Sequence, residues 1–223
     1  MPKFDTPAPI TAVLDIPAGR IRIVATDRAD TAVEVLPADA AKGRDVRAVQ
    51  ETLVEYGDGV LRVSAPAAKN QLLGETGAVA VTVELPSGSR VEAKTADAEL
   101  QGAGRLGDVT FDSARATVTL DETASARLTL LAGDVTVGRL GGPAHITTQK
   151  GALHIAEAVT GTVTLSTEHG PITVGAAPGV SASLDAGTSY GRIHNSLRNT
   201  EGDAAALHIQ ATTSYGDITA RSN

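Results

Sequence analysis

One pattern of polar and apolar residues recurs along the second half of the chain. A Thr, two variable residues and a Gly are followed by apolar residues two and four positions after the Gly. It reads TTQKGALHI at 147–155, STEHGPITV at 166–174, TSYGRIH at 188–194 and TSYGDIT at 213–219, with weaker copies at 95–101, 113–119 and 130–137. The corner positions are Ala98, Ala116, Gly133, Gly151, Gly170, Gly191 and Gly216, spaced by 18, 17, 18, 19, 21 and 25 residues. Such a period is the signature of a repeat architecture.

Apolar residues alternate at the period of a β-strand on both sides of each corner. The position two after the corner carries Leu100, Val118, Val135, Leu153, Ile172, Ile193 and Ile218, and the position five before it carries Ala93, Phe111, Leu128, Ile146, Leu165, Ala186 and Ala211. Each repeat therefore predicts two short strands that meet at a corner. Gly supplies a positive φ or a close backbone approach there, so the predicted structural turns are Gly133, Gly151, Gly170, Gly191 and Gly216.

A single repeat cannot bury its apolar face, whereas stacked repeats can. The sequence therefore predicts an all-β fold, a β-helix-like β-solenoid of about seven coils over residues 89–223. The Thr or Ser three residues before most corners is expected to form a hydroxyl ladder between coils. In chain order the last coil, Thr212–Ala220, has no obvious cap. Its open edge is predicted to be available for self-association.

Residues 1–88 are predicted to be an irregular N-terminal β region, or cap, that packs on the solenoid or continues it as one structural unit. Expected strands are Ile10–Leu14, Arg20–Thr26, Ala32–Leu36, Thr52–Tyr56, Val60–Ser64 and Val79–Leu85. Gly57-Asp58-Gly59 is typical of a hairpin turn. The segment 38–50 is expected to be a loop or short helix, and 66–77 a loop. DIPAGRIRI at 15–23 is echoed by ELPSGSRVEA at 84–93.

The opening Ile-Pro-Ala-Gly-x-Ile-x-Ile, the Leu-Pro-Ser-Gly entry to the repeats and the serial Thr-x-x-Gly-x-Ile-x-Val copies identify a resemblance. They are similar to the bacterial putative-adhesin family of β-strand-repeat-containing proteins, a domain of unknown function. The resemblance covers essentially the whole chain. It implies a β-solenoid with an adhesive or envelope-linked role, and it brings no established catalytic residues.

Composition narrows the classes of partner. Hydrophobic residues make up 42% and aromatic residues 2% of the 223, so Ala, Val, Leu and Ile must fill the core. The net charge of −7 argues against nucleic acid, because such binders usually present a basic face. No apolar run approaches the roughly 18 residues of a membrane span, and the N-terminus has no signal-peptide pattern. We therefore expect a cytoplasmic protein without direct membrane insertion.

The sequence contains few residues that could form a catalytic or metal-binding site. The chain has no Cys, and its histidines are His145, His154, His169, His194 and His208. His154 and His194 share an outward column but lie coils apart, too far to share a metal ion. The acids form no predicted glycosidase pair. We predict no catalytic residue, no metal site and no cofactor. A bactofilin-like self-assembling protein and a carbohydrate-active or acyltransferase-type β-helix enzyme are the alternatives.

One surface feature stands apart. His169, Tyr190 and Tyr215 each immediately precede a corner Gly, and two of the three Tyr of the chain lie here. Exposed Tyr pairs suit contact with a protein or a glycan, although such a ladder can also merely stiffen the turns. The sequence thus predicts a noncatalytic, adhesin-like interaction or scaffold module, with these three residues as its interaction patch.

Overall fold

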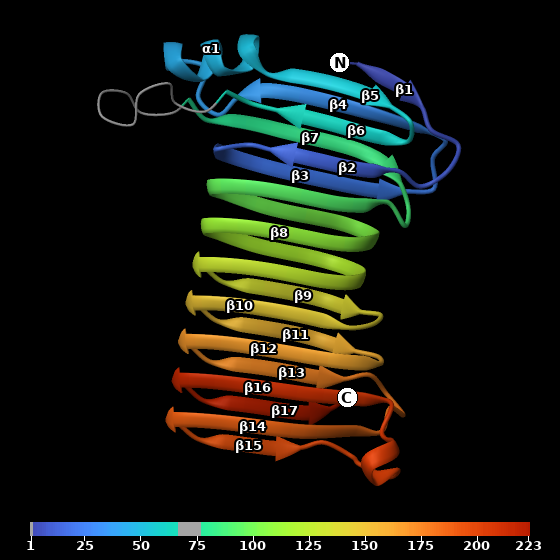
Figure 1. The fold of residues 1–223 in the computed structure, drawn as a ribbon, viewed down its shortest axis with the longest axis vertical. Helices are drawn as coiled ribbons and strands as arrows, with labels where there is room; N and C mark the ends of the chain where they lie inside the picture. The colour runs from blue at the N-terminus through green and yellow to red at the C-terminus, as the bar shows by residue number, and fades with distance from the viewer. Residues whose placement is uncertain (1, 67–76) are drawn as a thin grey trace. The chain divides into compact units, whose positions relative to one another are not determined.

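The computed structural model describes residues 2–66 and 77–223, and it is all-β with a large mixed sheet (Figure 1). The described residues form one short α-helix, and none of their helices is long and apolar enough to cross a membrane. The chain divides into two compact units, Met1–Ala116 and Thr117–Asn223. The boundary expected near residue 88 remains a prediction.

The first unit combines parallel and antiparallel pairing. Its strands are β1 (Lys3–Asp5), β2 (Thr11–Asp15), β3 (Ala18–Thr26), β4 (Asp30–Pro37), β5 (Leu53–Gly57), β6 (Val60–Ser64), β7 (Val79–Pro86) and the first part of β8 (Arg90–Ala132). β2 pairs in parallel with β6 and β8, and β3 does so with β7 and β8. β4 pairs antiparallel with β7 and β1, and β5 with β6.

All six strands expected before residue 88 are confirmed within two residues, whereas β1 was missed. The helix α1 (Gly43–Glu51) begins within the segment 38–50 and ends one residue beyond it. Asp58 and Gly59 both have positive φ, at 52° and 74°, as a tight hairpin between β5 and β6 requires. Most of the predicted loop 66–77 lies outside the described residues.

The pair β2–β3 is a further copy of the repeat that the spacing did not reveal. Gly19 pairs in register with the corner residue Ala98 and has a φ of 133°. A Cβ on Gly19 would stand 1.9 Å from the Val79 carbonyl oxygen. The echo between 15–23 and 84–93 is the signal for this copy in the sequence, but Ile16 stands where the motif has Thr, three residues before Gly19.

The second unit consists of strand pairs, each joined at a corner. After the end of β8 its strands are β9 (Val135–Leu140), β10 (Ala144–Lys150), β11 (Leu153–Ala158), β12 (Gly161–His169), β13 (Ile172–Ala176), β14 (Ala182–Tyr190), β15 (Ile193–Ser196), β16 (Leu207–Tyr215) and β17 (Ile218–Ser222), with the 3-10 turn η1 (Gly202–Ala204) before β16. All the pairings of these strands with one another are parallel.

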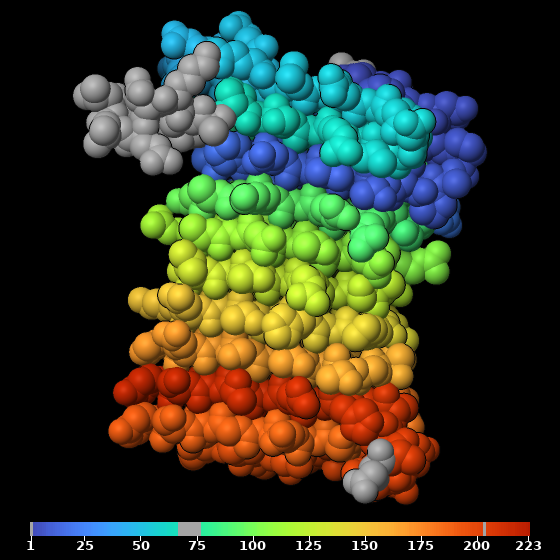
Figure 2. Space-filling view, in the orientation of Figure 1, coloured from blue at the N-terminus to red at the C-terminus, as the bar shows by residue number. Residues whose placement is uncertain are grey.

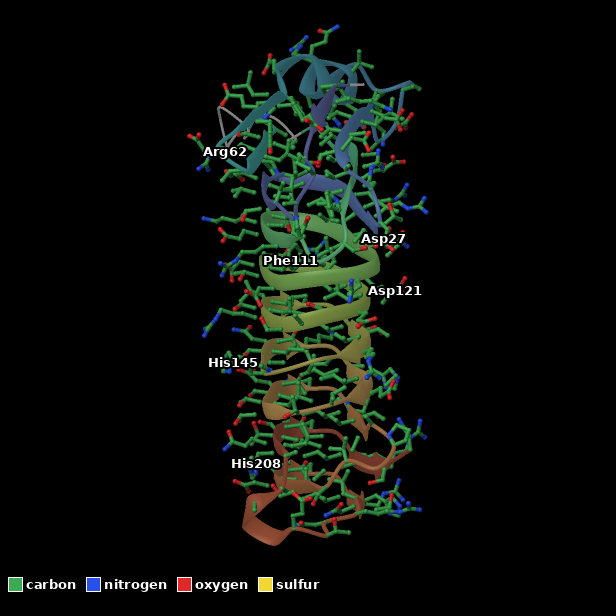
Figure 3. The ribbon with its side chains drawn as sticks, turned by 90° about the vertical axis from the view of Figure 1, so that its right-hand side faces the viewer. Asp27, Arg62, Phe111, Asp121, His145 and His208 are labelled. Carbon is green, nitrogen blue, oxygen red and sulfur yellow. The ribbon has the colours of Figure 1, made fainter. Side chains whose placement is uncertain are left out.

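Two parallel ladders run through this unit. One follows β8, β10, β12, β16 and β14, and the other follows β8, β9, β11, β13, β17 and β15. The predicted apolar columns are confirmed, because Leu128, Ile146, Leu165 and Ala211 pair in register and are buried. Figure 3 shows Phe111, from the first unit, inside its ribbon and His145 outside.

The repeats do not follow one another in space in chain order. The expectation that the C-terminal coil is the open end is wrong, because β16 pairs on one side with β12 and on the other with β14. β17 is likewise held between β13 and β15. In Figure 2 the red band of the last residues lies between two orange bands of earlier ones. The strands at the edge are therefore β14 and β15.

Candidate interaction site

The predicted interaction patch is a stack of three aromatic rings. His169 ends β12, Tyr215 ends β16 and Tyr190 ends β14. The His169 and Tyr215 ring centroids are 5.0 Å apart with 11° between planes, and those of Tyr215 and Tyr190 are 4.9 Å apart with 4°. The structure therefore brings all three residues together. We call this stack the ring ladder.

The order of the rings differs from chain order. Stacking in chain order would place His169 beside Tyr190, but Tyr215 lies between them because β16 is inserted between β12 and β14. Tyr215 consequently has a ring on both faces, whereas Tyr190 stacks on one face only. The exposed fractions are 67% for Tyr190 and 50% for Tyr215. The Tyr190 ring is therefore the free end of the ladder.

The corner glycines hold the rings at this spacing. The Gly170 N–H donates to the Tyr215 carbonyl at 2.9 Å, and the Gly216 N–H donates to the Tyr190 carbonyl at 3.0 Å. A Cβ on Gly170 would stand 2.0 Å from the Gly151 oxygen, and one on Gly216 would stand 2.0 Å from the Gly170 oxygen. The column of glycines is thus required by the close approach of neighbouring corners.

Threonine hydroxyls fasten the same corners, as the predicted hydroxyl ladder requires. Thr213 Oγ1 donates to the Gly170 carbonyl at 3.1 Å, and Thr188 Oγ1 donates to the Gly216 carbonyl at 3.1 Å. Thr167 makes the equivalent bond to Gly151 at 3.2 Å. Each hydroxyl thereby supplies a partner for a corner carbonyl of the neighbouring repeat.

An ion pair lies beside the ring ladder. Asp217 accepts from the Arg192 backbone N–H and from its guanidinium, both at 2.9 Å. The backbone bond first, and then the side-chain bond and charge of Arg192, hold the pKa of Asp217 below its ordinary value. Both residues directly follow the corner glycines, and the Arg192 side chain is 88% exposed. An exposed cation therefore lies two residues after Tyr190 in the chain, directly after the corner Gly191.

The other histidines lie apart from the ring ladder. His154 and His194 share one outward column, with Thr173 and Thr219 between them. His208 contacts Ser183 Oγ at 2.8 Å through Nδ1. Within residues 2–66 and 77–223, no group of three or more His, Cys, Asp or Glu side chains could hold a metal ion.

A surface groove on the first unit also has charged walls. Arg20, Arg22, Glu99 and Gln101 line part of it. The Glu99 carboxylate already accepts from Arg20 Nε at 3.2 Å and from the Gln101 amide at 3.3 Å. A lone carboxylate paired with an arginine lacks the second acid that a glycosidase mechanism needs. This groove therefore supplies no complete catalytic set.

Solved structures similar to this chain include bacterial proteins described as putative adhesins. One from Parabacteroides distasonis is 14% identical with a TM-score of 0.50, and the match covers 98% of this chain and 95% of that one. One from Bacteroides fragilis is 13% identical with a TM-score of 0.48, covering 98% and 95%. A putative cell adhesion protein from Clostridium sporogenes is 12% identical with a TM-score of 0.42, covering 100% and 98%.

The fold of the Parabacteroides protein agrees with the resemblance that the sequence indicates. At 14% identity the likeness to the Parabacteroides protein shows a shared fold and nothing about binding. No protein-family model and no curated protein matches the chain.

Proposed function

We propose that this chain is a noncatalytic β-solenoid interaction module of the adhesin type, and that it binds a protein partner through the ring ladder. The observation that carries the proposal is the stack of His169, Tyr215 and Tyr190, exposed on the surface of a chain with only three Tyr, two Phe and no Trp. Aromatic rings are otherwise almost absent from this sequence, and two of the five lie in this stack.

The two parallel ladders support the solenoid. Ala144 pairs with Ala126, 18 residues earlier, and Val163 pairs with Ala144, 19 residues earlier. Apolar residues occupy the buried columns, as stacked coils require. On such a scaffold a residue type that recurs at one repeat position forms a line on the surface, and this brings the three rings together.

The composition of the ring ladder favours a protein over a glycan. Tyr and Arg are the residues enriched at the energetic centres of protein interfaces. Tyr190 is 67% exposed and the Arg192 side chain is 88% exposed. Tyr supplies a large contact area while losing little side-chain entropy on binding, because its ring is rigid.

A photo-crosslinking experiment tests this function. With p-benzoylphenylalanine in place of Tyr190, we expect one discrete adduct with a second protein in cells of the native organism. The matched control carries the same group at Thr136, which is exposed in the same unit but distant in the repeat series. Adducts of equal yield at both positions, or at neither, would contradict the proposal. A glycan-array signal abolished by Tyr190→Ser would instead assign a glycan partner.

A further inference from the structure

β14 and β15 form an open sheet edge at one end of the second unit. β14 pairs with β16 and β15 pairs with β17, and among the described residues no strand pairs with their outer sides. In Figure 1 the two strands lie beyond β16 and β17. Because backbone groups alternate in direction along a strand, half of the N–H and C=O groups on both strands point outward from this edge.

Two columns of apolar side chains that are buried in the neighbouring repeats are exposed at this edge. Ile193 is 47% exposed, whereas its column neighbours Ile218 and Ile172 are 1% and 0% exposed. All four residues of β15 are exposed. Leu184 is half-buried, while its partner Ile209 is fully buried. The end therefore presents interior side chains as well as unpaired backbone.

The link between β15 and β16 holds the start of this edge in place. The edge is not a chain terminus, because residues 197–206 lead from β15 back to β16. The Ala182 N–H donates to the Arg198 carbonyl at 3.0 Å, and the Thr200 and Glu201 N–H groups donate to Ser181 Oγ at 3.1 Å. The link thus fastens the start of β14. The strand beyond Ser183 has no such cover among the described residues.

The usual obstacles to edge pairing are absent from the two strands. β14 carries one charged residue, Asp185, in nine positions, and β15 carries none. Neither strand contains Pro or Lys, which block many natural sheet edges. By contrast, two of the three residues of β1 are charged.

The charge of this region favours a second copy of the chain. Residues 182–201 contain two acids, Asp185 and Glu201, and two bases, Arg192 and Arg198, for a net charge of zero in a chain of net charge −7. Two identical edges therefore do not repel each other at close range. A two-fold axis sets identical strands antiparallel, so that each edge supplies the partner for the other.

We infer that the outer edge of β14 and β15 is a dimerisation surface that pairs with the same edge of a second copy of this chain. The contact buries Ile193 and Leu184 and satisfies the outward backbone groups of both strands. An isologous contact buries the same surface of both copies, and no copy of that surface remains for a third chain. The product is therefore a closed dimer and not a filament. Tyr190 ends β14, so the free face of its ring lies at the same edge, and Ile193→Lys tests the dimer without altering the ring ladder.

Sedimentation velocity of the full chain across concentration tests the inference. We expect twice the monomer mass of 22.6 kDa, and we expect Ile193→Lys to weaken the dimer by about tenfold or more, since an edge charge opposes strand pairing. Leu131→Lys is the matched control, because Leu131 is an exposed apolar side chain at 52% in the same unit. This control should dimerise like the wild type.

A second variant, Ala186→Lys on β14, guards against a folding defect in the first. Circular dichroism and melting of each variant establish whether it is folded, and a folded variant that loses the dimer supports the inference. A wild type that stays monomeric up to hundreds of micromolar overturns it. Open-ended assemblies, or a dimer that both edge variants leave intact, overturn it equally.

Discussion

Replacing Gly170 by Ala is expected to lower the free energy of unfolding by about 3 kcal/mol. Two effects act together. The Gly170 φ of 152° lies where side chains are rarely accommodated, and the new Cβ would stand 2.0 Å from the Gly151 carbonyl oxygen. That oxygen belongs to the backbone and already accepts from Thr167 Oγ1, so it cannot easily move away.

Thermal unfolding measures this effect, and the expected loss in melting temperature is roughly 6–12 °C. Gly187→Ala is the matched control. Gly187 lies in β14, where a Cβ meets nothing within 4 Å and no positive φ is required. Equal losses for the two variants would show that the corner column is not close-packed.

Replacing Tyr215 by Ala is expected to lower the free energy of unfolding by about 2 kcal/mol, because the central ring and its stacking contacts on both faces are lost. The distances of 5.0 Å to His169 and 4.9 Å to Tyr190 define both contacts. Tyr190→Ala removes only one stacking contact and should lower the free energy of unfolding by about half as much. Chemical denaturation of both variants measures the difference.

Tyr215→Phe is the control for this comparison. The Phe ring keeps both stacks and removes only the hydroxyl, so its unfolding free energy should stay close to that of the wild type. If Tyr190→Ala costs more than Tyr215→Ala, the central position of Tyr215 is contradicted.

Much of this structure can be predicted from the sequence, because each repeat contains the residues that determine its own strands and corner. Alternating apolar residues fix which side chains are buried, and the Gly after each Thr-x-x fixes the corners. The gathering of His169, Tyr190 and Tyr215 follows from their common repeat position. These predictions depend only on local pattern, and each repeat supplies that pattern independently.

The order of the last two repeats could not be predicted in the same way. The position two after the corner is Ile in three repeats, at Ile172, Ile193 and Ile218. The pattern therefore does not indicate which of these repeats are neighbours in space. One signal was present. Asn195 stands where other repeats have Val137, Ile155, Val174 or Ala220, and a polar residue in that column is best placed at an exposed edge.

The longer spacing of 25 residues before Gly216 is the second signal. It provides the link 197–206 that carries the chain past β14 and into the gap beside β12. The ring order and the identity of the open edge both follow from this insertion.

Engineered cysteine pairs test that insertion most directly, since the chain has no native Cys. Gln210 pairs in register with Thr164 on one side and with Asp185 on the other. Neighbouring parallel strands lie about 4.8 Å apart, within reach of a disulfide, whereas strands two apart exceed the limit of about 7 Å between Cα atoms. We predict rapid disulfide formation in Thr164→Cys/Gln210→Cys and none in Thr164→Cys/Asp185→Cys. The reverse outcome would show that the repeats follow chain order and would contradict the account.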